Sequence, residues 1–492
     1  MSFISLNFVV LFACTFILYH TLPSRFRKAT LLTASCIFIG FYHLAFLITA
    51  LILTLATFYL GKWIGQTKRE SSMKGIYFSG VCFLVVSWLA FRYADRLTNC
   101  HILFPLGISF YTFQAISYLT EIYWQEEEPK KSLPDFMIYM LFFMKFLSGP
   151  IERASDMLPQ LKSCKATDYA SMVYGMRLIV VGLIKKLILA DSIAPYIDGV
   201  FGSVYTASGV QLLMACLLYP IELYADFSGG IDISRGVAQM FGITMGENFR
   251  RPYFSRTLTE YWHRWHISLG DWLRNYLFYP LSISKAFLNW GRHAKQHLGN
   301  HIGKVLPTAV ASLITFLVIG IWHGASWKYV AFGFWNGMVI LVSTLLQPVS
   351  DKVVAGLHIE RKSAWYQVFS MLRTFVVVLI GYYFDIADGF RAAMGMMAKS
   401  VTDLHLSQLR PSAVLEALPL TKYDWAVLLF GTIVIFVASV IQERSQRTIR
   451  EILDEKRLAL RWVVLLGGIF AVVLMGVYGP GVQASEFVYM QF

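Results

Sequence analysis

The chain has 492 residues, of which 56% are hydrophobic and 16% aromatic, while only 15% carry a charge. Its mean hydropathy is +0.55, and no soluble packing arrangement hides that much apolar surface. The formal net charge of +13 comes from Lys and Arg residues clustered between apolar runs. This clustering favours membrane topology over nucleic-acid binding as the origin of the charge.

Apolar runs long enough to cross the roughly 30 Å hydrocarbon layer recur along the chain. We count about eleven such spans, and the clearest are Phe3–Leu22, Leu306–Trp322, Ala426–Ile441 and Trp462–Tyr478. The N-terminus lacks the pattern of a cleavable signal peptide, so the first span is expected to remain as an anchor. With no internal repeat or long linker, the sequence predicts an all-α, polytopic membrane protein with a single domain over residues 1–492.

Basic segments between the spans predict the orientation of the chain. Three basic residues lie within Pro23–Lys28, and a larger cluster lies within Arg444–Arg461, before the last span. Both segments are expected in the cytoplasm, which places both termini outside. Between Pro23–Lys28 and the next basic segment, Lys62–Lys74, the apolar stretch Ala29–Gly61 predicts a helical hairpin.

Two segments do not fit a simple span. Gly149–Arg153 and Asn248–Pro280 mix aromatic, charged and Pro residues. Irregular backbone is tolerated at membrane depth only where protein or a water-filled cavity surrounds it. We therefore expect re-entrant or interfacial helices here.

His323 is the first candidate for chemistry, because it ends a long apolar run and is flanked by Gly320 and Gly324. An imidazole accepts a proton near neutral pH, which suits a general base that activates a hydroxyl. The small neighbours are expected to leave room for a substrate. The alternative is an interfacial histidine beside the belt tryptophans Trp322 and Trp327.

The second candidate is the segment Glu260–Arg274, which is dense in His, Arg and Trp. At helical spacing, His263 and His266 lie on one face. Acidic and basic side chains of the segment can pair within the protein, or the segment is an amphipathic interfacial helix. No third ligand stands at a telling spacing, so no metal site is predicted.

The third candidate is Tyr224–Asp232, a Gly-containing break that follows an apolar run and carries Asp226 and Asp232. Carboxylates beside such a break can orient a base or bind a cation. They can equally cap the next helix at its N-terminus. For Asp232 the capping role is favoured.

Five segments in order resemble successive motifs of the membrane-bound O-acyltransferase (MBOAT) superfamily. The resemblance extends from near residue 100 to near residue 345, and its blocks containing WHIS and WHGA are highly specific. The five segments are Pro105–Phe113, Gly149–Leu161, Ala225–Ser234, Glu247–Leu277 and Ile321–Gly337.

The resemblance implies helices around a central tunnel, with His266 and His323 as the two catalytic histidines. It implies no tightly bound cofactor, with acetyl-CoA as the acyl-donor substrate. Supporting roles are predicted for Trp322, Asp226, Arg264, Asp271, Arg274 and Asn336.

Within the superfamily, the chain looks most similar to bacterial enzymes that O-acetylate alginate, other exopolysaccharides or peptidoglycan, with teichoic-acid D-alanylation as a near relative. That branch implies a multi-pass protein of the bacterial inner membrane, a cell-envelope polysaccharide acceptor and an SGNH-hydrolase-like extracytoplasmic partner. Asn275 and Leu281–Ser284 depart from the alginate-type pattern.

The tail Phe487–Phe492 is similar to aromatic C-termini in which a tyrosine is suspected of carrying the acyl group. This makes Tyr489 a candidate acyl relay, and the alternative is an aromatic tail at the membrane interface. Three further interpretations stay open, of which one is acylation of a lipid or a protein within the same superfamily. A proton-coupled transporter also uses intramembrane ionisable residues, and a binding scaffold needs no catalytic histidine.

Overall fold

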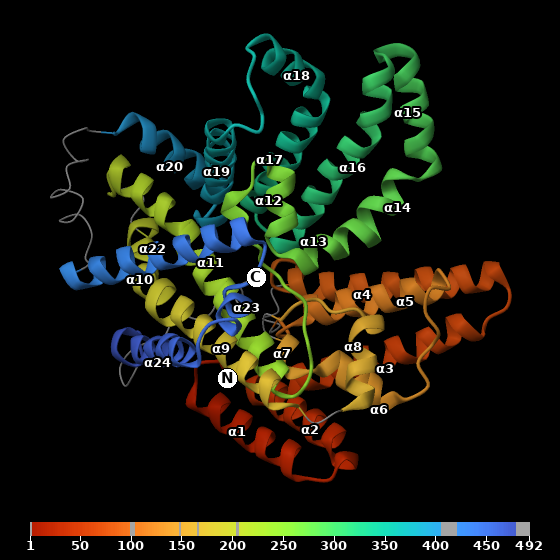
Figure 1. Cartoon of the computed structure of the whole chain (residues 1–492). Coiled ribbons are helices and arrows are strands. Elements are labelled where there is room, and N and C mark those ends of the chain that lie inside the picture. Colours follow the sequence, from red (N-terminus) through yellow and green to blue (C-terminus); the bar gives the residue numbers. More distant parts are fainter. Residues whose placement is uncertain are drawn as a thin grey trace. The chain divides into compact units, whose positions relative to one another are not determined.

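The computed structural model describes residues 2–98, 104–146, 149–164, 167–202, 206–404 and 421–478. Over these residues the regular structure is helical, apart from an isolated antiparallel bridge between Phe249 and Trp265. The all-α prediction is therefore confirmed (Figure 1). The chain divides into two compact units, residues 1–188 with 225–247 and 447–491, and residues 189–224 with 248–446 and 492.

The first unit contains the N-terminal helices, the second half of α11 and the last two helices. Their bounds are α1 (Leu6–Thr21), α2 (Ser24–Tyr42), α3 (Leu44–Gln66), α4 (Glu70–Thr98), α5 (Ile108–Tyr123), α6 (Leu133–Leu141), α7 (Phe143–Phe146), α8 (Ala154–Ser163), α9 (Tyr169–Leu183), most of the π-helical η1 (Ile184–Ala190), α23 (Ile449–Asp454) and α24 (Leu458–Met475).

The second unit contains the first half of α11 and most of the motif-bearing segments. Its elements are α10 (Asp191–Phe201), α11 (Gly209–Met240), the 3₁₀ turn η2 (Pro252–Phe254), α12 (Leu258–Arg264), α13 (Ile267–Leu273), the π-helical η3 (Arg274–Phe278), α14 (Tyr279–Ser282), α15 (Lys285–Leu298), α16 (Asn300–His323), α17 (Trp327–Leu345), α18 (Gln347–Gly356), α19 (Ala364–Ile386), α20 (Phe390–Thr402) and α22 (Lys422–Ser445).

Eight of the described helices are long and apolar enough to cross a membrane: α3, α4, α11, α16, α17, α19, α22 and α24. The shorter apolar helix α1 coincides with the predicted first span. The predicted hairpin over Ala29–Gly61 is present, because α2 ends at Tyr42 and α3 begins at Leu44. The count of about eleven spans, the single domain and the orientation of the termini stay predictions.

The predicted break over Tyr224–Asp232 is wrong, because α11 runs through it without interruption. The glycines serve helix packing instead: a Cβ on Gly229 would lie 2.8 Å from the carbonyl oxygen of Gly182 on α9. Asp232 does not cap a helix. Its carboxylate accepts from Lys185 Nζ at 2.7 Å within the first unit.

Candidate active site

His266 lies between two short helices in a left-handed backbone conformation. Helix α12 ends at Arg264 and α13 begins at Ile267, and His266 has φ +46° and ψ +55°. A non-glycine residue pays roughly 1–2 kcal/mol for this conformation, so the surrounding structure must hold it. The side chain is 5% exposed.

Asn248 holds the chain immediately after His266. Its backbone oxygen accepts from the Ile267 N–H at 3.0 Å, and its side-chain Oδ1 accepts from the Ser268 N–H at 2.8 Å. On the other side of His266, an isolated antiparallel bridge joins Trp265, the residue after α12, to Phe249. The turn that carries His266 is therefore pinned on both sides.

Two aromatic residues attach α12 to other helices of the second unit. The hydroxyl of Tyr261 lies 2.8 Å from that of Tyr382 on α19. The indole N–H of Trp262 donates to Asn336 Oδ1 on α17 at 3.1 Å. Asn336 is itself fixed, because its Nδ2 donates to the Phe332 carbonyl at 2.9 Å. These hydrogen bonds fix the position of α12 relative to α17 and α19.

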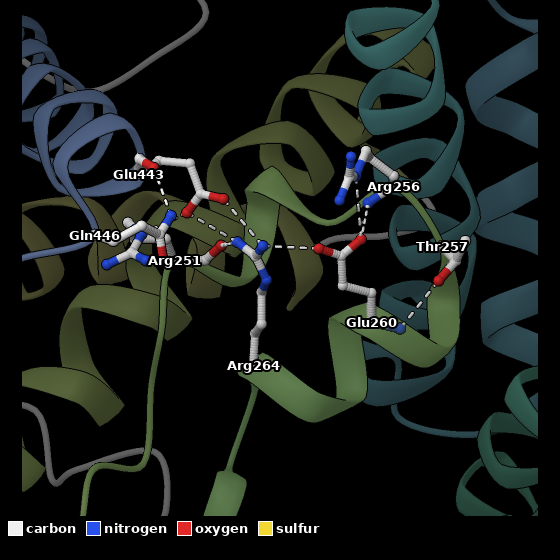
Figure 2. A network of polar contacts seen from close by, with 7 residues as sticks. All are labelled: Arg251, Arg256, Thr257, Glu260, Arg264, Glu443 and Gln446. Atoms are coloured by element: carbon white, nitrogen blue, oxygen red, sulfur yellow. Dashed lines mark hydrogen bonds and ion pairs between the residues drawn. The ribbon is translucent and has the colours of Figure 1, made fainter. Parts of the chain in front are cut away.

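Arg264 attaches the last turn of α12 to α22. Its Nη1 and Nη2 donate to the two carboxylate oxygens of Glu443, each at 3.0 Å, and Nη2 also donates to Glu260 at 2.7 Å. Arg251 Nε donates to Glu443 at 2.6 Å. Figure 2 shows both guanidinium groups converging on this one carboxylate.

His323 is the last residue of α16, where the helix crosses α17 closely. A Cβ on Gly320 would lie only 2.3 Å from the carbonyl oxygen of Tyr329, so backbone occupies the space beside Gly320. For Gly320, the expectation that a small residue leaves room for substrate is wrong. The crossing instead fixes the end of α16, and with it the half-buried His323.

The two histidines meet around Trp322. The ring centroid of Trp322 lies 6.4 Å from that of His266 and 4.9 Å from that of His323. Burial, with a smaller effect from His323, lowers the pKa of His266 to about 3. His266 is therefore a neutral imidazole near neutral pH, able to donate a hydrogen bond but a poor proton acceptor. The structure thus brings His266 close to Trp322 and His323, which follow it by 56 and 57 positions in sequence.

The remaining predicted residues lie in different surroundings. Asp226 belongs to the first unit, where it forms a buried ion pair with Lys186 at 2.5 Å. Asp271 and Arg274 pair with each other at 2.5 Å and are partly exposed. The prediction that His263 and His266 share a helical face is wrong, because α12 ends between them and His263 is exposed. Tyr489 lies outside the described residues.

Sequence reasoning missed Asn248, Tyr382 and Glu443. Asn248 stood inside a recognised motif, and a buried asparagine beside a predicted irregular turn is a recoverable signal. Tyr382 and Glu443 lie 116 and 177 residues after His266. Only the fold brings them to α12.

Comparison with known proteins agrees with the motifs. The sequence model of the membrane-bound O-acyltransferase family matches residues 125–384. The chain is 31% identical to a probable alginate O-acetylase of Azotobacter vinelandii over 91% of this chain and 86% of the relative. It is 30% identical to a peptidoglycan O-acetyltransferase of Helicobacter pylori over 64% of each chain. A teichoic acid D-alanyltransferase of Streptococcus thermophilus is 25% identical over 65% of this chain and 78% of the relative. The chain belongs to the membrane-bound O-acyltransferase family.

Proposed function

We propose that this protein transfers an acetyl group from cytoplasmic acetyl-CoA to hydroxyl groups of an extracytoplasmic cell-envelope polysaccharide. The observation that carries the proposal is the meeting of His266 and His323 around Trp322, on the two motif segments of an O-acyltransferase family. The alginate and peptidoglycan O-acetylating relatives support acetyl as the group and a polysaccharide as the acceptor.

In the proposed mechanism, His323 is the general base. It takes the proton of an acceptor hydroxyl, whose oxygen attacks the thioester carbonyl to form a tetrahedral intermediate. The neutral ring of His266 donates a hydrogen bond to the oxyanion. When the intermediate collapses, the carbon–sulfur bond breaks and protonated His323 returns its proton to the departing thiolate. The products are an ester and free CoA.

Donor and acceptor stand on opposite sides of the membrane in this scheme. We propose that the protein lies in the bacterial inner membrane with both termini outside, as the basic segments predict. The thioester then reaches the histidines from the cytoplasmic side through a protein-lined path. An SGNH-hydrolase-like extracytoplasmic protein presents the polysaccharide, and Tyr489 is the candidate relay between the two.

The second candidate function is D-alanyl transfer to teichoic acid, which the similarity to a teichoic acid D-alanyltransferase favours. It uses the same base and the same oxyanion donor, and differs in the acyl group and its carrier. A proton-coupled transporter is disfavoured because the two histidines lie on the motif segments of a transferase family.

The proposal is tested with purified protein in detergent and acetyl-CoA labelled in the acetyl group. The measurement is the release of CoA and of labelled product by the parent, His323→Ala, Tyr489→Phe and a mock purification. His297→Ala is a matched control, because His297 is an exposed histidine of α15 in the same unit. Removing a general base lowers turnover by about 10²–10⁴-fold, so we expect that loss for His323→Ala and none for His297→Ala.

Each outcome has a defined reading. Equal cleavage by the parent and His323→Ala rules out the base. Cleavage no faster than in the mock rules out unassisted turnover of acetyl-CoA, and D-alanyl thioester is then the donor to compare. A labelled ester on the parent tail that is missing from Tyr489→Phe supports the relay, and label transfer independent of Tyr489 refutes it.

A further inference from the structure

Helix α22 lies beyond the region that the family model matches, which ends at residue 384. Its Glu443 nevertheless makes the polar contacts that tie down the His266 segment. The carboxylate accepts from Arg251 at 2.6 Å and from both terminal nitrogens of Arg264 at 3.0 Å (Figure 2).

The geometry of these contacts is specific. A guanidinium that binds both oxygens of one carboxylate fixes distance and plane together, which a single hydrogen bond does not. The three side chains are 12–23% exposed, so water competes with them only weakly. Glu260 takes a further hydrogen bond from Arg264 at 2.7 Å, and this holds the guanidinium toward α12 as well.

A second contact supports the same placement of α22. The ring of Phe436 stacks on that of Phe254 in η2, with centroids 5.8 Å apart and an interplanar angle of 24°. Phe436 and Glu443 are seven positions apart, which is two helical turns on the same side of α22. Helix α22 therefore contacts both the segment before α12, through Phe436, and the end of α12, through Glu443.

The clamp lies close to His266 along the chain. Arg264 is two residues before His266, and its carbonyl accepts from the Arg250 N–H at 2.9 Å. Arg250 precedes Arg251 directly. The two backbone segments that this hydrogen bond joins therefore each carry an arginine that binds Glu443. Because the His266 backbone is left-handed, it relaxes unless such contacts hold it.

We infer that Glu443 is a positioning residue of the active site: through Arg251 and Arg264, it holds the backbone turn that buries and aims His266. Its effect on catalysis rests on the proposed acyl transfer. Its effect on the burial of His266 does not.

The first test measures that burial without any substrate. The full-length protein in detergent is treated with diethyl pyrocarbonate, which modifies accessible neutral imidazoles, and the modified tryptic peptides are quantified by mass spectrometry. Cleavage after Arg264 separates the peptide of exposed His263 from that of buried His266. His263 therefore serves as an internal standard in every sample.

We expect Glu443→Gln to raise the modification rate of His266 by about tenfold relative to His263, because loss of the charged acceptor releases both arginines. Glu443→Asp keeps the charge and should lie between parent and Gln. Asp351→Asn is the matched control, since it removes an exposed ion pair with Arg361 in the same unit. It should leave His266 protected.

The second test is steady-state acetyl transfer. Glu443→Gln should lower kcat by about tenfold or more, with the donor KM within about twofold, because misplacement of His266 affects the transition state rather than donor binding. The melting temperature of each variant is recorded alongside. Protection of His266 in a folded Glu443→Gln protein equal to that of the parent overturns the inference, as does an unchanged kcat. An inactive parent rules out unassisted turnover of acetyl-CoA and leaves the inference standing, since the modification experiment still decides the role of Glu443.

Discussion

Gly320→Ala tests whether the α16–α17 crossing fixes His323. A Cβ at this position would meet the Tyr329 carbonyl oxygen at 2.3 Å and its carbon at 3.1 Å. Restoring an ordinary contact of about 3.4 Å requires the helices to separate locally by about 1 Å. Overpacking of this kind costs about 1–3 kcal/mol, and the better helix propensity of alanine offsets about 1 kcal/mol. The net decrease in the free energy of unfolding is therefore at most about 2 kcal/mol.

The effect on activity should be much larger, because His323 is only three residues further along α16. A displacement of about 1 Å at a catalytic group costs on the order of 10²-fold in rate. We expect acetyl-CoA turnover by Gly320→Ala to fall by roughly that factor, with a melting temperature only a few degrees below that of the parent.

Gly395→Ala is the matched control. Gly395 lies exposed within α20 of the same unit, and a Cβ there meets nothing within 4 Å. The same chemical change should stabilise that helix by about 0.5–1 kcal/mol and leave turnover unchanged. Parent-like turnover in Gly320→Ala would refute the idea that the crossing positions His323.

Three further results are expected. Burial lowers the pKa of His266 to about 3, so below pH 6.5 the unfolded state binds a proton that the folded state does not. Lowering the pH from 7.5 to 5 should therefore reduce the free energy of unfolding by about 2 kcal/mol. His266→Gln should show a correspondingly weaker pH dependence of unfolding. Lys186→Met should destabilise the first unit by about 3–5 kcal/mol, because it removes the cation 2.5 Å from the buried carboxylate of Asp226. The double variant with Asp226→Leu should unfold at a higher temperature than either single variant. Tyr382→Phe should cost about 1–3 kcal/mol in thermal unfolding, because its hydroxyl lies within hydrogen-bonding distance of both Tyr253 and Tyr261.

The sequence was sufficient to predict the helical class, the hairpin of α2 and α3, and the two histidines that the fold brings to Trp322. The prediction was wrong where a glycine allows two backbones to approach closely rather than breaking a helix or leaving space for a substrate. Gly229 and Gly320 were interpreted as a break and as space for a substrate, but each lies where another backbone approaches within 3 Å of its missing Cβ. Local pattern cannot distinguish these cases, because it does not show where the partner backbone lies: Gly182 precedes Gly229 by 47 residues, and Tyr329 belongs to the next helix after Gly320. Glu443 gave no signal because Arg251 and Arg264 precede it by 192 and 179 residues, and because it is one charged residue near the end of an apolar helix.

The different environments of the two histidines argue for different chemical roles. His266 is buried and neutral, so near neutral pH it can donate a hydrogen bond but not take up the proton of a hydroxyl. His323 is half-buried at a helix end, and it is the histidine that we propose as the base. Pairs of like side chains in unlike surroundings are a common way to divide such roles.

This division predicts an asymmetry between matched substitutions. The amide of His266→Gln can still donate to the oxyanion, so turnover of acetyl-CoA should fall by about tenfold, whereas His323→Gln has no base and should lose about 10²-fold or more. Both variants place the same side chain at a histidine position, which controls for the loss of the ring. If His266→Gln is the more damaged of the two, with both proteins folded, then His266 rather than His323 carries the proton, and its burial must be relieved when substrate binds.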